Sequence, residues 1–165
     1  MDLIVSAAGE ARWRELRFRC ALGKGGLKRN KREGDGATPI GAWPMRRLLY
    51  RADRMTAPAT RLPSSPIAPQ DGWCDDPADP AYNRPVRLPF GGRHERLWRE
   101  DEIYDLLVVL GHNDDPVVAG LGSAIFLHVA RGDYRPTEGC VALVHADLAR
   151  VLVEAAPGDR VVVEG

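Results

Sequence analysis

Prolines and turn-forming residues crowd residues 56–100 of this 165-residue chain, first in APATRLPSSPIAPQDGW and then in DDPADPAYNRPVRLPFGG. Proline has no backbone N–H to donate, so it breaks helix interiors and central strands. This density excludes long helices and central strands from the middle of the chain. Because Trp73, Tyr82, Phe90 and Trp98 can dock on an apolar core, we expect ordered irregular structure here, with disorder as the alternative.

Strand signals flank this middle stretch as short runs of β-branched and aliphatic residues bounded by Gly, Asp or Pro. They lie at residues 3–5, 17–22, 104–110, 124–129 and 160–164. One helical pattern stands out at 145–156, where apolar residues recur at helical spacing until Pro157-Gly158-Asp159 ends it. Many short strands with one late helix predict a mainly β, sandwich or barrel-like fold. A chain of this length can bury one core, so we expect a single domain over residues 1–165.

The charge balance excludes a strongly basic nucleic-acid-binding protein. Lys+Arg and Asp+Glu both number 23, which gives a formal net charge of zero. Hydrophobic residues make up 44% and charged residues 28%, which is typical of a folded globular chain. The longest clean apolar run, 106–110, is far too short for a membrane span. Residues 1–17 have no basic segment ahead of an apolar run, so no secretory signal is predicted.

A basic, glycine-rich segment between Leu27 and Thr38 shows no apolar periodicity, and we expect it to be an exposed loop. Its cations and those just before it are Lys24, Lys28, Arg29, Lys31 and Arg32. Phosphate binding is the alternative function for such a segment. The G-x-x-x-x-G-K-[ST] pattern is absent, however, so the sequence favours a solvated loop.

A histidine and a cysteine near the end of the chain could form a nucleophile and its base. His128 ends a predicted strand, and Cys140 follows twelve residues later, directly behind Gly139. A thiol is mostly protonated at neutral pH, so a thiol nucleophile needs an imidazole beside it. Backbone N–H groups of Gly139 and Cys140 could form an oxyanion hole. The alternative is that both residues are structural, the cysteine a small buried apolar residue and the histidine a hydrogen-bonded one.

Zinc is a competing interpretation of the same region, since His112, His128, Cys140 and His145 are suitable ligand types. None of them is paired at the spacing of a helical H-x-x-x-H or a C-x-x-C, so we expect no metal. His112 is expected to hold the turn after the 104–110 strand or to line a cleft. His145 is expected to form a hydrogen bond at a helix start, and His94, beside Gly-Gly, to be exposed to solvent.

These residues resemble the L,D-transpeptidase catalytic domain, the YkuD-like family of bacterial peptidoglycan enzymes. The family motif is a His, a spacer, and then [S/T]-H-G-C-hydrophobic-Arg. This chain supplies His128, a spacer, and Thr137-Glu138-Gly139-Cys140-Val141. The segment EGDGATPIGAW (33–43) is similar to the family's T-P-x-G segment. The resemblance spans about residues 15–164.

The resemblance implies a YkuD-like β fold with a helix after the catalytic cysteine. It implies that Cys140 is the nucleophile and His128 the general base of a cofactor-free cysteine acyltransferase. An orienting group for the imidazole is needed, and Asp133 is a candidate. Further candidates for the substrate cleft are Thr137, Glu138, Tyr134 and His112.

The implied partners are donor and acceptor stem peptides of peptidoglycan, with carbapenems as covalent inhibitors. The implied location is the periplasm or the cell wall. A carboxypeptidase or hydrolase of the same fold, and a noncatalytic cell-wall-binding module, are the alternative functions. Neither a nucleic-acid partner nor a membrane span is expected.

Two positions depart from the family motif. Glu138 stands where the motif has His, and Ala142 where it has Arg. A carboxylate that faced the thiol would raise its pKa, whereas one that faced solvent would not. The short spacer between His128 and Cys140 implies an open cleft. These departures leave the donor position open between the third residue of the stem and the first.

Overall fold

The computed structural model describes residues 1–165 and contains fourteen short strands and one helix. The strands and the helix, in chain order, are β1 (Asp2–Val5), β2 (Glu10–Trp13), β3 (Leu16–Arg19), β4 (Leu27–Lys28), β5 (Thr38–Pro39), β6 (Gly41–Tyr50), β7 (Ser64–Pro66), β8 (Asp71–Cys74), β9 (Pro85–Arg87), β10 (His94–Arg96), β11 (Leu106–Leu110), β12 (Phe126–Val129), β13 (Val141–Leu143), α1 (His145–Glu154) and β14 (Arg160–Val163).

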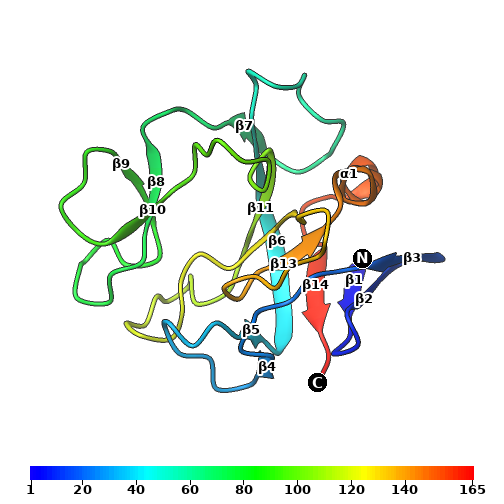
Figure 1. Cartoon of the computed structure of the whole chain (residues 1–165), viewed down its shortest axis with the longest axis horizontal. Helices are drawn as coiled ribbons and strands as arrows, with labels where there is room; N and C mark the ends of the chain where they lie inside the picture. The colour runs from blue at the N-terminus through cyan, green and yellow to red at the C-terminus, as the bar shows by residue number, and fades with distance from the viewer.

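The largest sheet forms a nearly closed barrel around β6. Its strand order is β13-β12-β11-β6-β14-β1-β2-β3, and β7 also pairs with β6. Just past β3, Ala21 exchanges two backbone hydrogen bonds with Ala142 of β13, at 2.8 and 3.0 Å, which joins the two ends of the sheet. Figure 1 shows this barrel on one side of the molecule, with α1 and both chain ends beside it. The prediction of a mainly β, barrel-like fold with a helix after Cys140 is confirmed.

Apolar residues from alternating strand positions fill the barrel, and α1 adds Leu148, Val151 and Leu152 to the same core. The helix begins at His145 as predicted and ends at Glu154, ahead of the expected end. It is the one helix of the structure, and it lacks the length and the apolar character of a membrane-spanning helix.

Strand limits differ from the sequence prediction by a few residues. The strand expected at 17–22 ends at Arg19, where the chain turns toward β13. The strands expected from residues 104 and 124 begin at Leu106 and Phe126. Beyond these limits the backbone forms single hydrogen bonds or an isolated bridge, such as Leu110 to Ile125 and Ala21 to Ala142, instead of a continuous ladder.

The proline-rich middle is ordered and forms a small sheet of its own, in the order β10-β8-β9. Figure 1 shows this sheet standing apart from the barrel. Trp73 and Tyr82 are buried as expected of anchoring residues, while Phe90 and Trp98 are half-buried. The prediction that His94 is exposed is wrong: it is half-buried, and its ring lies edge-on to Phe90.

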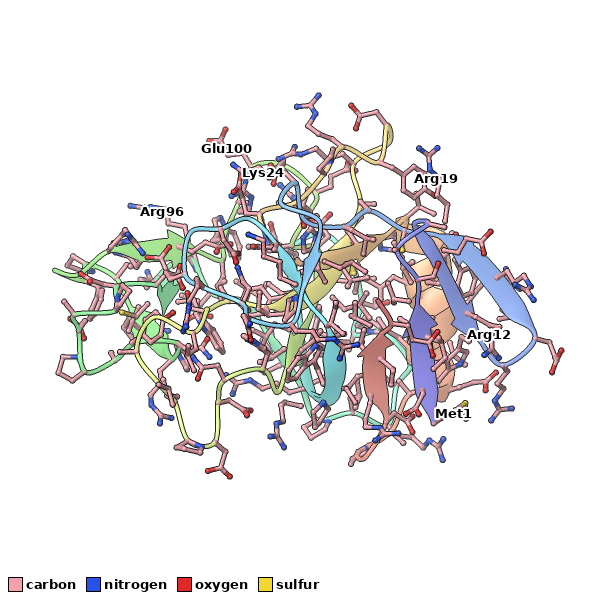
Figure 2. All side chains as sticks on the ribbon, turned by 90° about the horizontal axis from the view of Figure 1, so that it is seen from below. Met1, Arg12, Arg19, Lys24, Arg96 and Glu100 are labelled. Carbon is pink, nitrogen blue, oxygen red and sulfur yellow. The ribbon has the colours of Figure 1, made fainter.

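The basic segment is more structured than the sequence predicted. Its two ends, β4 and β5, pair in parallel. Lys31 is buried rather than solvated, because Asp35, four residues later, neutralises its ammonium group in an ion pair. The expectation of a wholly exposed loop is therefore wrong at Lys31, although Lys24 lies at the tip of its loop in Figure 2.

Candidate active site

The position of His128 follows from strand alternation in β12. Leu127 and Val129 point into the barrel core, so Phe126 and His128 point to the opposite face. His128 is only 5% exposed. Its Nδ1 lies 2.9 Å from the carbonyl oxygen of Val129. A carbonyl can only accept, so Nδ1 carries the hydrogen and Nε2 is left free to take a proton.

The orienting group of the imidazole is thus a backbone carbonyl, and the candidate Asp133 is wrong. Asp133 lies at the surface, where its carboxylate pairs with Arg135 at 3.2 Å. The ring of Tyr104 packs edge-on against the His128 ring, with 5.3 Å between ring centroids. Burial lowers the pKa of His128 to about 4, so the imidazole is neutral at physiological pH.

Cys140 lies directly before β13, and its side chain is buried. Its Sγ accepts a hydrogen bond from the backbone N–H of Phe126 and donates to the carbonyl of Ala124, both at 3.3 Å. Burial raises the pKa of the thiol to about 12. No hydrogen bond joins Sγ to His128, so the resting site holds a neutral thiol and a neutral imidazole rather than an ion pair.

The turn before Cys140 is held by the hydroxyl group of Thr137, which accepts from the N–H of Gly139 at 3.1 Å and donates to the carbonyl of Cys140 at 2.7 Å. The N–H of Gly139 is therefore occupied, and of the two predicted oxyanion donors only that of Cys140 has no partner. Gly139 has a φ of 136°, and a Cβ on it would lie 2.8 Å from the carbonyl oxygen of Ala37. Only glycine fits this position.

The T-P-x-G segment supports the same turn from the other side. Thr38 is buried, accepts a hydrogen bond from the N–H of Gly23 at 2.8 Å, and lies 3.5 Å from the carbonyl of Cys140. Gly23 in turn forms a bridge with Thr137. The two matched motifs are therefore parts of one structure around the thiol.

One cavity of about 560 Å³ brings together Cys140, His128, Thr137 and Glu138. The carboxylate of Glu138 is 79% exposed and pairs with Lys24 at 2.8 Å, so it faces solvent rather than the thiol. Besides Glu138, the cavity lining carries five cationic and three acidic side chains. They are Lys31, Arg93, Arg99, Arg131 and Arg135, with Glu33, Asp75 and Glu95.

Two predicted cleft residues lie outside this cavity. His112 is buried against Trp43, with 4.7 Å between ring centroids, and burial lowers its pKa to about 4. It occupies the turn after β11, in agreement with the first of the two positions expected for it. Tyr134 lies under the guanidinium group of Arg19 and lines a separate groove. The predictions of His112 and Tyr134 as lining residues are therefore not supported by this geometry.

The four candidate zinc ligands are not brought together. His145 is exposed at the start of α1, where its side chain makes no capping hydrogen bond, and His112 lies against Trp43. No group of three or more His, Cys, Asp or Glu side chains has the arrangement of a metal site.

Sequence reasoning missed Glu95, a carboxylate of β10 that lines the cavity. The hydroxyl group of Tyr104 donates a hydrogen bond to it. Burial raises the pKa of Glu95 to about 7, and its charge also contributes to the raised pKa of Cys140. No sequence signal marks Glu95, because the proline-rich middle carries no motif and its docking onto the barrel depends on long-range contacts.

Comparison with known proteins agrees with this geometry. The family model described as YkuD, L,D-transpeptidase catalytic domain, matches residues 6–163. No curated protein matches the chain. The chain is similar in fold to the crystal structure of the helical cell shape determining protein Pgp2 from Campylobacter jejuni, with 15% sequence identity and a TM-score of 0.52. That match covers 99% of this chain and 46% of Pgp2, so the chain spans less than half the length of that protein.

The family match covers nearly all of the barrel and both motifs that surround the thiol. The chain therefore belongs to the YkuD family of L,D-transpeptidase catalytic domains.

Proposed function

We propose that this protein is an L,D-transpeptidase that crosslinks peptidoglycan stem peptides through a thioester on Cys140. The observation that carries the proposal is the presence of Cys140 and His128 on the wall of one cavity. Family membership supports it as well. The mixed charge of the lining suits a zwitterionic peptide, and the periplasm or cell wall is the location that follows from this substrate.

In the first step, Nε2 of His128 takes the thiol proton while Sγ of Cys140 attacks a stem-peptide carbonyl. The free N–H of Cys140 stabilises the oxyanion that forms. Because both groups are neutral at rest, proton transfer accompanies attack instead of preceding it. His128 then returns the proton to the leaving amine, and the thioester remains.

In the second step, an amine of another stem peptide attacks the thioester carbonyl, a C–N bond forms and the C–S bond breaks. The donor carbonyl belongs to the third residue of its stem, or to the first in a variant reaction. Water in place of the amine would give a carboxypeptidase.

The experiment that tests the nucleophile uses a carbapenem, whose strained carbonyl mimics the donor. Intact-mass spectra of the wild type should show one adduct, located on Cys140 by peptide mapping. Cys140→Ala and His128→Ala should show none, whereas the matched controls Cys20→Ala and Cys74→Ala should react like the wild type, since neither thiol lines the cavity. An adduct on Cys140→Ala would overturn the proposal.

A further inference from the structure

Glu95 differs from the other charged side chains that line the cavity, because it has no oppositely charged partner. Arg99 pairs with Asp101 at 2.7 Å, Arg93 with Asp75 at 3.1 Å, and Lys31 with Asp35. No cation lies within ion-pair distance of the Glu95 carboxylate. The nearest cationic influence is the charge of Arg99, which acts on Glu95 from beyond that distance while its guanidinium group is paired with Asp101.

The remaining charged residues of the lining have partners too. Arg131 pairs with Asp101 at 3.3 Å and Arg135 with Asp133 at 3.2 Å. Glu33 accepts hydrogen bonds from Tyr82 at 2.6 Å and Ser123 at 2.8 Å. A partly buried carboxylate without a counter-ion is costly to keep charged, and a cation that entered the cavity would relieve that cost.

The place of Glu95 puts such a cation in the same cavity as the reacting sulfur. Glu95 lies on β10 opposite Trp73 of β8, so the small sheet holds it against the barrel. The carboxylate accepts a hydrogen bond from the hydroxyl group of Tyr104, and the ring of Tyr104 packs edge-on against His128. Its negative charge acts directly on Cys140. Carboxylate, imidazole and thiol therefore line the same cavity.

We propose that Glu95 binds the ammonium group of the acceptor stem peptide and takes its proton, so that the free amine can attack the thioester. This role rests on the proposed function, because only a transpeptidase has an amine as its second substrate. An aliphatic amine is protonated at neutral pH and is not a nucleophile in that form, so a transpeptidase needs a group that removes this proton.

The proton balance of the step is complete. The ammonium group gives one proton to the Glu95 carboxylate and becomes an amine. Its nitrogen then forms the C–N bond, and the C–S bond breaks. The second proton leaves the nitrogen as the amide forms and returns the Cys140 thiolate to the thiol, by way of His128. Glu95 afterwards releases its proton to solvent. A carboxyl group whose pKa burial raises to about 7 can both take and release a proton at neutral pH.

The test separates the two halves of the reaction in Glu95→Gln. The amide oxygen of glutamine can still accept the hydrogen bond of Tyr104, so the contact between β10 and the segment before β11 is kept. Formation of the acyl-enzyme from a donor stem peptide, followed by mass spectrometry, should be as fast as in the wild type or faster. Formation of crosslinked dimers should fall by about 10²-fold or more, the usual contribution of a positioned base.

Two controls distinguish a base from a structural residue. Hydroxylamine, a nucleophile that is neutral at neutral pH, should release the acyl group from Glu95→Gln and from the wild type at the same rate. Glu95→Asp, which keeps a carboxylate, should recover part of the crosslinking. Glu100→Gln changes an exposed carboxylate outside the cavity (Figure 2) and should behave like the wild type.

Equal loss of acylation and crosslinking in Glu95→Gln would overturn the role of Glu95 and show that the residue is structural. Unchanged crosslinking would overturn it as well. A wild-type protein that forms no thioester on Cys140 would instead overturn the proposed function, and this role with it.

Discussion

The resting thiol of Cys140 should react with alkylating reagents very slowly at neutral pH. Its pKa of about 12 lies roughly three units above that of an ordinary cysteine, so its thiolate fraction is about a thousandfold smaller. In free energy, forming the thiolate costs about 4 kcal/mol more than it does in a free cysteine. The cause is burial, together with the charge of Glu95 and without an imidazolium partner.

Alkylation by iodoacetamide, with peptide mapping to separate the three cysteines, measures this reactivity. The logarithm of the Cys140 rate should rise by about one per pH unit from pH 6 to 10, because each unit increases the thiolate tenfold. Glu95→Gln should raise the rate, whereas Glu138→Gln should leave it unchanged because that carboxylate pairs with Lys24 in solvent. A plateau between pH 6 and 8 would refute the reasoning, since it would reveal a thiolate–imidazolium pair.

Two further predictions concern stability. Burial lowers the pKa of both His112 and His128 from 6.5 to about 4, so their contribution to stability is present above pH 6.5 and is lost as the pH falls through 4. The pKa of Glu95 is raised to about 7, so its contribution is fully present below its unfolded value of 4.5 and is lost as the pH rises through 7. Between pH 6.5 and 4.5 the gain from protonating Glu95 offsets the loss from protonating one of the two histidines. The free energy of unfolding of Glu95→Gln, measured by urea titration, should therefore fall more steeply on acidification than that of the wild type, by about 1.4 kcal/mol per pH unit. Parallel curves for the two proteins would contradict this. Gly139→Ala should lower the free energy of unfolding by at least about 2 kcal/mol, because the added Cβ meets the Ala37 carbonyl at a positive φ. Gly132→Ala, with open space around it, should change that free energy little. Similar values for the two variants would show that Gly139 is not required by its backbone conformation.

The parts of the fold that local patterns determine could be predicted from the sequence. Short β-branched and aliphatic runs with turn residues at their ends predicted β1, β11, β12 and β14, and helical spacing predicted α1. These patterns succeed because the apolar residues of each run decide its burial: β11 and β12 are buried on both faces, and α1 has one apolar face.

The wall of the site depends on contacts between distant segments, and local patterns do not report those. Lys31 reads as a loop cation, yet Asp35 and the surrounding fold bury it. Glu95 carries no motif, and only the contact of β10 with Tyr104, ahead of β11, brings it to the cavity that holds the thiol. Likewise, the pairing of Glu138 with Lys24, more than a hundred residues away in sequence, decides that this carboxylate faces solvent.

The motif residues Cys140 and His128 could be predicted as a pair, whereas their resting state could not. The residue types predicted a thiol with an imidazole beside it. The structure has two neutral groups, because both side chains are buried and each is hydrogen-bonded to backbone groups instead of to the other. Protonation states follow from burial and from hydrogen-bond partners, which require the three-dimensional structure.

Mass spectrometry of purified muropeptides incubated with the wild type and with Cys140→Ala tests transpeptidation through Cys140 most directly. The account predicts new crosslinked dimers with the wild type alone, whose fragmentation identifies the donor residue. Shortened monomers without dimers would show a hydrolase, and dimers formed equally by Cys140→Ala would contradict the role of the thiol.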